Sequence, residues 1–362
     1  MNNFVICATR SMRSYASSVV SKLAKFPGFS GLEEQFNKVD LLTTDRFADG
    51  EMEVVVNASV RGRDIFLFTS CARNESNIGV EEAKIELYHA LDALKRAQAN
   101  KIIVIEPFVS SSRSDRTFRR SSVGLWTHLK ILSSLGVQHI VTYQFHSDKA
   151  KSMMDPVVCA IDDVPALNLL KKYICDNYIK SLEKLEHEVR TQWAFCSVDA
   201  GGEKLTRNFA DAFGAPLVVG HKQRDYSQTN TIESINILSA EPIEGKSLWI
   251  VDDMIDTAGS VEALIHALAR LKPREINIIA VHALFSPPAA KRLNALSAKG
   301  LLSRIIVTDT VFPNSMPEQI SGLDIVPSTE LAASIIKIII NNESLYKVLR
   351  NFDANIYLRS QK

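Results

Sequence analysis

The stretch Leu248–Leu268, with the sequence LWIVDDMIDTAGSVEALIHAL, decides the fold class of this chain. It opens with the apolar residues Leu248–Val251, which are suited to a buried strand. Small residues form a short turn at 256–260, and apolar residues then recur at helical spacing as far as Leu268. Strand, short turn and helix form the repeating unit of an α/β protein with a parallel sheet.

The turn at 256–260 has the chemistry of a phosphate site. A helix N-terminus offers unpaired backbone N–H groups and a partial positive charge, and the hydroxyls of Thr257 and Ser260 can donate as well. Asp252 and Asp253 would repel a phosphate, so their expected targets are sugar hydroxyls or a bound cation. Phosphate, sugar and cation together indicate a phosphorylated ribose. The residues alone leave open a simpler interpretation, in which the acids end a strand and Ser260 caps a helix.

Apolar segments of strand length recur along the chain and alternate with amphipathic helices. The expected strands lie at 4–8, 64–69, 102–106, 139–145, 193–198, 216–219, 248–252, 276–281 and 304–307. Helices are expected at 15–26, 82–97 and 203–213, where apolar residues follow the helical period. This alternation predicts an α/β fold with parallel sheets and helices on both faces. The charged segment 180–190 is expected to form a solvated surface helix.

The composition excludes several classes of protein. The 42 basic and 41 acidic residues give a net charge of +1, so we expect no nucleic-acid partner. No apolar run reaches membrane-spanning length, so we expect no membrane partner. The five cysteines are dispersed without Cys-x-x-Cys spacing, which favours reduced thiols in a cytoplasmic protein. The first 32 residues contain no acid, so organellar import stays open.

The string VDDMIDTAGS at Val251–Ser260 resembles the ribose-5-phosphate loop of phosphoribosyltransferases and, more narrowly, of ribose-phosphate pyrophosphokinases. The resemblance implies two tandem phosphoribosyltransferase-type (type I) domains, each a mostly parallel sheet flanked by helices. We expect an N-terminal domain at 1–165 with the nucleotide loops, a C-terminal domain at 166–340 with the ribose-5-phosphate loop, and a tail at 341–362. The residues implied to bind ribose 5-phosphate are Arg224, Asp252, Asp253, Asp256, Thr257, Ala258, Gly259 and Ser260.

Two segments of the first half resemble the nucleotide loops of this family. In Arg46–Glu51 (RFADGE), Phe47 can stack on a purine, although a phenylalanine taken alone is more often a core residue. In Arg113–Arg116 (RSDR), the forked guanidinium of Arg113 suits a phosphate. The resemblance implies ATP binding by Phe47, Asp49, Gly50, Glu51, Arg113, Ser114 and Asp115.

The second of these segments departs from the family pattern at three places. Ser114 stands where the family usually has glutamine, and Phe118 stands where a second aspartate is usual. The stretch Arg120–Gly124 replaces a proline-containing one. These departures leave the preference among nucleotide donors open.

Metal and transition-state residues are implied by three further segments. His146 follows the strand at 139–145 and Asp199 lies in the SVDAGG string; the resemblance implies that both bind Mg²⁺, with ATP phosphates supplying other ligands. Residues 219–231 are polar and without periodicity, which predicts an exposed loop. Lys222 and Arg224 match the two cations of the family's mobile catalytic loop, where they would neutralise transition-state charge.

The activity implied by the resemblance is Mg²⁺-dependent transfer of diphosphate from ATP to the 1-hydroxyl of ribose 5-phosphate, leaving AMP. Two alternatives stay open: a non-catalytic regulatory paralogue, and a type I phosphoribosyltransferase. The family also implies a homo-oligomer, a hexamer built from dimers. The segments 59–62 and 341–344 resemble parts of its regulatory anion site, which predicts a response to inorganic phosphate.

Overall fold

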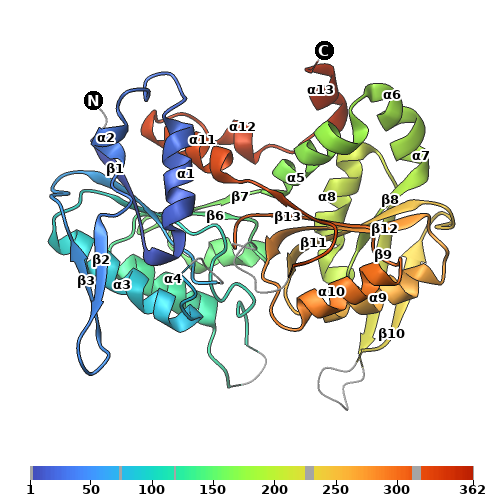
Figure 1. Ribbon diagram of the computed structural model, residues 1–362, viewed down its shortest axis with the longest axis horizontal. Helices are drawn as coiled ribbons and strands as arrows, with labels where there is room; N and C mark the ends of the chain where they lie inside the picture. The colour runs from blue at the N-terminus through green and yellow to red at the C-terminus, as the bar shows by residue number, and fades with distance from the viewer. Residues whose placement is uncertain (1–2, 73–75, 118–119, 225–231, 312–318, 362) are drawn as a thin grey trace. The chain divides into compact units, whose positions relative to one another are not determined.

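The computed structural model describes residues 3–72, 76–117, 120–224, 232–311 and 319–361 (Figure 1). The chain forms two compact units. The first comprises Met1–Pro165, Thr310–Ser315 and Pro327–Leu349, and the second comprises Ala166–Asp309, Met316–Val326 and Arg350–Lys362. Below, they are called the first unit and the second unit.

The first unit is built on a five-stranded sheet in the order β1-β4-β5-β6-β7. All neighbouring strands in it are parallel. The strands are β1 (Phe4–Ala8), β4 (Asp64–Phe68), β5 (Ile102–Ile105), β6 (His139–Tyr143) and β7 (Ala160–Val164). The helices α1 (Arg13–Leu23) and α11 (Thr329–Ile340) cover one face, and α3 (Val80–Arg96) and α4 (Gly124–Ser134) cover the other (Figure 1).

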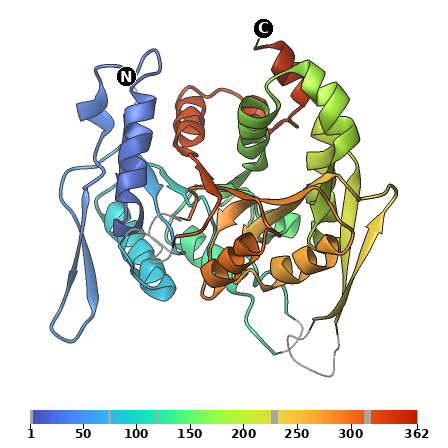
Figure 2. The ribbon, with the colours of Figure 1, turned by 45° about the vertical axis from the view of Figure 1, so that its right-hand side comes forward.

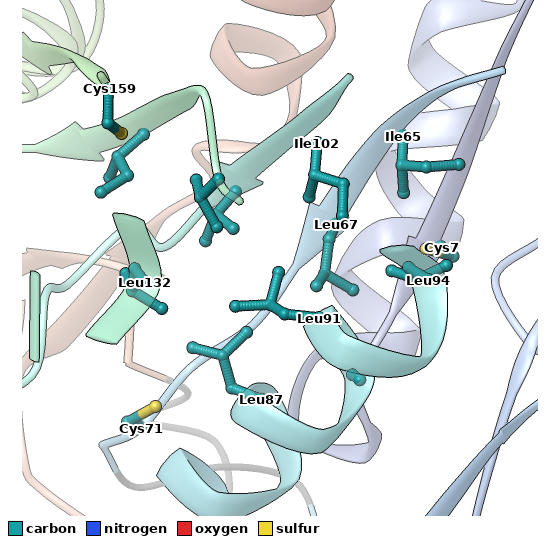
Figure 3. Close-up of a cluster of buried hydrophobic side chains, with 14 of the residues drawn as sticks. Cys7, Ile65, Leu67, Cys71, Leu87, Leu91, Leu94, Ile102, Leu132 and Cys159 are labelled. Atoms are coloured by element: carbon teal, nitrogen blue, oxygen red, sulfur yellow. The ribbon is translucent and has the colours of Figure 1, made fainter. Parts of the chain in front are cut away.

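The core of the first unit lies between its sheet and α3. Leu87, Leu91 and Leu94 point from α3 toward Leu67 and Ile102 of the sheet (Figure 3), and all five are fully buried. These leucines recur at the spacing of one helical face, which is why the sequence predicted this helix. Burial of a leucine side chain stabilises the fold by about 2 kcal/mol.

A separate two-stranded sheet carries the first nucleotide segment. The strands β2 (Leu42–Arg46) and β3 (Met52–Val56) pair in antiparallel register, with residues 47–51 at the tip. Gly50 has φ +95°, a value that side chains other than hydrogen rarely tolerate. The shorter helical segments of this unit are η1 (Arg10–Met12), α2 (Glu33–Phe36), η2 (Asp148–Met153) and α12 (Tyr346–Leu349).

The second unit is built on a seven-stranded sheet in the order β10-β9-β8-β11-β12-β13-β14. Only the β9–β10 pair in it is antiparallel. Its strands are β8 (Trp193–Ser197), β9 (Leu217–Arg224), β10 (Ile232–Ser239), β11 (Ser247–Ile255), β12 (Glu275–Ala283), β13 (Arg304–Thr308) and β14 (Leu323–Val326).

Helices cover both faces of this second sheet. One side carries α5 (Leu167–Ile174) and α8 (Glu203–Phe213), and the other carries α9 (Gly259–Ala269) and α10 (Ala289–Ala298), as Figures 1 and 2 show. The remaining helical segments are η3 (Cys175–Ile179), α6 (Leu182–Lys184), η4 (Leu185–Val189), α7 (Arg190–Gln192), η5 (Ala200–Gly202) and α13 (Ala354–Arg359).

The predicted fold class is confirmed: both units are mostly parallel sheets flanked by helices. The domain ranges 1–165, 166–340 and 341–362 stay a prediction. The compact units divide the chain differently after residue 309, and they share the predicted tail between them. Helix α11 groups with the first unit because it packs against α1. The charged segment 180–190 is helical as expected, but it is not wholly solvated, since Leu185 and Val189 are fully buried.

The predicted loop at 219–231 is wrong for its first half. Residues 219–224 belong to β9, whose Lys222 lies opposite Ile235 of β10. Strand pairing comes from the backbone, so a polar segment can extend a strand without the apolar pattern that sequence analysis looks for. Residues 225–231 lie outside the described residues. The strands β2, β3, β7, β10 and β14 were also missed, and they are short, half-exposed or at sheet edges.

The five cysteines lie in the interior of the protein. All five cysteines are free and buried, and burial raises the pKa of the Cys196 thiol to about 12, which leaves that thiol protonated and unreactive. No helix in the described part of the chain is long and apolar enough to cross a membrane.

Candidate functional site

The two acids and the turn singled out first in the sequence stand at the carboxyl end of β11. This strand continues through Asp252 and Asp253 to Ile255, and α9 begins at Gly259. Between them Ala258 adopts φ +60° and ψ 7°, the left-handed region in which a small side chain is tolerated best. The backbone therefore turns from strand to helix within three residues.

The carboxylates at this turn lie in one another's electrostatic field. Desolvation raises the pKa of Asp252 well above its usual range, and the charges of Asp253 and Asp199 raise it further. The backbone N–H of Asp253 donates to the Asp252 carboxylate at 3.0 Å. Asp199 belongs to the same unit, so its effect on Asp252 shows that the turns after β8 and β11 lie close together.

The turn after β8 is a second strand-to-helix turn of small residues. Asp199 accepts a hydrogen bond from the backbone N–H of Gly202 at 3.2 Å, and η5 then leads into α8. On the neighbouring strand, a Cβ added to Gly220 would lie 2.9 Å from the carbonyl oxygens of both Ser197 and Val198. Only glycine fits there, because backbone atoms cannot move aside as a side chain can. Sequence analysis missed Gly220, since nothing local marks it.

An arginine from α10 supports the turn at 256–260. Arg292 donates to the carbonyl oxygen of Thr257 at 2.9 Å and forms an ion pair with Glu262 of α9 at 3.1 Å. A Cβ added to Gly259 would lie 2.9 Å from Nη1 of this arginine. Arg292 was also missed, because in the sequence it resembles any charged residue on an amphipathic helix.

The first nucleotide segment forms the tip of the β2–β3 hairpin. Phe47 is 56 % exposed, so the alternative interpretation of this side chain as a core residue is wrong. The tip is fixed by its own backbone: the Phe47 N–H donates to the Glu51 carbonyl, and the Gly50 N–H donates to the Phe47 carbonyl, both at 2.9 Å. Asp49 accepts from the Glu51 N–H at 3.1 Å. The aromatic ring is thus accessible for stacking, on a turn that is hydrogen-bonded to itself.

The second nucleotide segment follows β5, and its Ser114 has a structural contact. The Ser114 hydroxyl accepts a hydrogen bond from the backbone N–H of Gly124 at 2.9 Å, and its carbonyl accepts from the Leu125 N–H at 3.2 Å. Both donors belong to the first turn of α4, whose N–H groups have no partner within the helix. Ser114 therefore caps the N-terminus of α4. ATP binding by Arg113, Ser114 and Asp115 stays a prediction.

The remaining predicted site residues occupy both units. His146 lies exposed in the bend after β6 of the first unit, and Asp199 lies in the second. Lys222 and Arg224 lie on β9, as described above. Within the described ranges, no three histidine, cysteine or acidic side chains gather closely enough to hold a metal ion by themselves.

Both halves of the chain match known families. Residues 4–136 match the N-terminal domain of ribose phosphate pyrophosphokinase, and residues 173–320 match the phosphoribosyl transferase domain. A ribose-phosphate pyrophosphokinase of Fusobacterium nucleatum is 31% identical over 83% of this chain and 87% of its own length. One of Porphyromonas gingivalis is 28% identical over 95% of this chain and 97% of its own length.

A solved structure supports the same assignment. The crystal structure of phosphoribosylpyrophosphate synthetase from Mycobacterium smegmatis superposes with a TM-score of 0.77 at 26% identity, covering 94% of this chain and 100% of that one. The fold and the turn after β11 define an α/β protein with two phosphoribosyltransferase-type domains. More narrowly, the chain belongs to the ribose-phosphate pyrophosphokinase family.

Proposed function

We propose that this chain is a ribose-phosphate diphosphokinase, which transfers the β,γ-diphosphate of ATP to the 1-hydroxyl of ribose 5-phosphate and leaves AMP. The observation that carries the proposal is the turn after β11. Asp252, whose pKa is raised by burial and by its neighbour Asp253, stands beside a helix N-terminus of small residues, in a chain of this family. Such a site suits a ligand with hydroxyls at one end and a phosphate at the other.

Ribose 5-phosphate binds along this turn. Its 5-phosphate accepts hydrogen bonds from the backbone and hydroxyl groups of 256–260, with Arg224 as a further cation. Asp252 and Asp253 accept from the ribose hydroxyls or hold them through a cation. Bound hydroxyls or a cation relieve the repulsion that raises the pKa of Asp252 in the free protein.

ATP binds through the two nucleotide segments of the first unit. Phe47 stacks on the adenine, Asp49 and Glu51 accept hydrogen bonds from its amino or ribose groups, and Arg113 and Asp115 address the phosphate region. The exposure of Phe47 supports this assignment.

Magnesium fits the residues present. Asp199 raises the pKa of Asp252, so negative charge accumulates where a cation would be stabilised, and His146 and Asp199 are the side chains that would hold it. When bound, Mg²⁺ neutralises phosphate charge and makes the ribose hydroxyl more acidic. Lys222 and Arg224 neutralise the charge that develops on the transferred diphosphate and the leaving AMP.

The proposal is tested by incubating the purified chain with ATP, Mg²⁺ and ribose 5-phosphate and measuring AMP and phosphoribosyl diphosphate. Asp256→Ala is the matched negative control, since it removes one residue of the sugar-phosphate turn. AMP that appears only with ribose 5-phosphate present supports the proposal. No product, with ATP still bound, would favour a regulatory paralogue. Consumption of phosphoribosyl diphosphate with a nucleobase would favour a phosphoribosyltransferase.

We also propose that the protein works in the cytoplasm as a homo-oligomer, a hexamer built from dimers, and that inorganic phosphate changes its activity. The segment 341–344 offers one supporting detail. Asn342 stands where the family usually has glycine, and it adopts φ +54°, a conformation that asparagine tolerates better than most residues. Light scattering tests the assembly, and a fully active monomer would refute it. Activity that is indifferent to millimolar phosphate would refute the regulatory part alone.

A further inference from the structure

Beneath the loop that carries Arg113 lies a buried network of ionisable side chains. Glu106, directly after β5, is fully buried, and its Oε2 lies 3.0 Å from Nε2 of His128 on α4. Nδ1 of this histidine lies 2.9 Å from the hydroxyl of Tyr88 on α3. His128 is 2 % exposed. A buried carboxylate is costly unless it is fully hydrogen-bonded, so this network needs an explanation.

The donor and acceptor along each hydrogen bond of the network follow from which atoms carry a proton. An ionised Glu106 can only accept, so Nε2 of His128 carries a proton and donates to it. A neutral imidazole then accepts at Nδ1 from the Tyr88 hydroxyl. Burial raises the pKa of Tyr88 well above its usual range, so the tyrosine keeps the proton that it donates. The donors thus point in one direction, from Tyr88 through His128 to Glu106.

The other side of Glu106 holds the loop itself. Oε1 of Glu106 accepts a hydrogen bond from the backbone N–H of Ser110 at 3.0 Å. Burial raises the pKa of the Cys71 thiol well above its usual range, and the charge of Glu106 and a hydrogen bond to Glu106 raise it further, so the thiol stays a donor to this carboxylate. The Glu106 carboxylate thus accepts from Ser110, His128 and Cys71, and each of these donors is held in place by the surrounding fold.

A lysine anchors the next residue of the same loop. Lys84 of α3 donates to the Ser111 hydroxyl at 3.1 Å and pairs with Glu81 at 2.9 Å. Ser111 adopts φ +64°, a strained value for a serine, and such values persist only where the surroundings impose them. Arg113 stands two residues further on. The conformation of this loop is thus imposed from beneath by Glu106 and Lys84.

We propose that Glu106, oriented by His128 and Tyr88, is a positioning residue that holds residues 110–115 in the conformation that binds the nucleotide phosphates. The inference rests on the proposed function, because it assigns the loop an ATP phosphate as its ligand. It adds to that function a support built from α3, α4 and the end of β5.

The same sheet supplies a matched control. His139, the first residue of β6, forms a second histidine–acid pair, with Nε2 2.7 Å from Oδ2 of Asp162. This pair lies at the amino end of its strand, whereas Glu106 follows the carboxyl end of β5. Removing either histidine breaks one such pair, but only His128 acts on the loop.

The test compares His128→Gln, Tyr88→Phe and His139→Gln in the full-length chain. We expect His128→Gln to raise KM for ATP about tenfold, because a flexible amide cannot bond to Glu106 and Tyr88 at once as the ring does, with kcat and KM for ribose 5-phosphate within about twofold. Tyr88→Phe, which removes one hydroxyl and no ring, is expected to raise KM for ATP by a few-fold. His139→Gln should change neither constant. Equal changes for both substrates, or the same change in His139→Gln, would overturn the proposal.

Two measurements separate this inference from the proposed function. Calorimetry with ATP and Mg²⁺, without ribose 5-phosphate, measures nucleotide affinity without turnover, and amide hydrogen exchange at 110–115 measures the order of the loop. A chain that bound ATP, lost about tenfold affinity in His128→Gln and made no AMP would leave the inference standing and refute the proposed function. Unchanged exchange and affinity in an active His128→Gln enzyme would refute the inference alone.

Discussion

The turn after β11 and the loop after β5 are built in different ways, although we propose a phosphate ligand for both. At 256–260 the backbone itself would form the proposed site, because small residues turn the chain into α9, whose N-terminal N–H groups have no partner within the helix. At 107–116 the backbone is held in place by side chains, including Glu106 and Lys84 from beneath and the hydroxyl of Ser114 at α4.

The difference decides which site a sequence can reveal. A turn formed by the backbone needs small residues in a fixed order, so a short string of sequence is enough to predict it. A loop built by side chains needs only suitable partners, and these can change together while the loop keeps its shape. This explains how Ser114 can stand where the family usually has glutamine and still belong to an ordered loop.

The first prediction asks whether the two regions serve one reaction at all. Lys222→Ala should lower kcat by about 10²–10³-fold with little change in KM for ribose 5-phosphate, because a preorganised cation acts mainly on transition-state charge. Lys246→Ala is the control, since Lys246 pairs with Glu241 in a turn and carries no predicted role. Steady-state kinetics on both variants provides the measurement. Near-normal turnover in Lys222→Ala would remove the catalytic assignment of β9.

The second prediction tests the backbone-built turn. Gly259→Val should raise KM for ribose 5-phosphate about 100-fold, because the new side chain meets Arg292 and obstructs the approach of the phosphate. Ala267→Val, two turns along the same helix, carries the same β-branch away from the turn and should leave KM near normal. Circular dichroism checks that both variants fold. Unchanged sugar-phosphate affinity in Gly259→Val would contradict the assignment.

Much of the fold was predictable because its signals are local. The apolar strands such as Leu248–Val251 and the leucine face of α3 are visible within a few residues, and the turn at 256–260 is defined by small side chains. Site residues that lie in such a string could be proposed from the sequence. Their binding roles stay predictions.

The rest was not predictable because its causes lie far apart in the sequence. Gly220 must be glycine because of the Ser197 and Val198 carbonyls on the next strand. Arg292 matters through the Thr257 carbonyl, and Glu106 through Ser110 and a histidine on α4. A sequence shows each of these residues as an ordinary glycine, arginine or glutamate, and only the packed structure shows the partner.

The third prediction tests whether Ser114, in the loop after β5, supports the loop or contacts the nucleotide. Ser114→Ala should lower the free energy of unfolding by about 1 kcal/mol, the effect of losing a helix cap, and should change KM for ATP by less than about threefold. Thr127→Ala, at an exposed position within α4, is the control for stability. Denaturant unfolding and ATP kinetics measure the two effects separately. A large rise in KM without loss of stability would show that Ser114 contacts the nucleotide directly.

The smallest expected effect concerns the acids at the turn after β11. Because the pKa of Asp252 is raised in the folded protein, the folded state binds more protons than the unfolded state, and stability is lost as the pH rises above the unfolded value of about 3.9. Asp252→Asn removes this loss, so the variant should have a Tm about 2 °C higher than the wild type at pH 8 and no advantage at pH 3.5. Thermal unfolding at the two pH values, without metal or substrate, measures the difference.

The same variant should lose affinity for ribose 5-phosphate, since the carboxylate that destabilises the free protein is the one that we propose accepts from the sugar. Glu262→Gln on α9 is the control, because its carboxylate pairs with Arg292 and its removal should not stabilise the protein at pH 8. If Asp252→Asn were less stable than the wild type at pH 8, the acid pair would be structural, and the turn would lose the electrostatic feature that distinguishes it from the loop after β5.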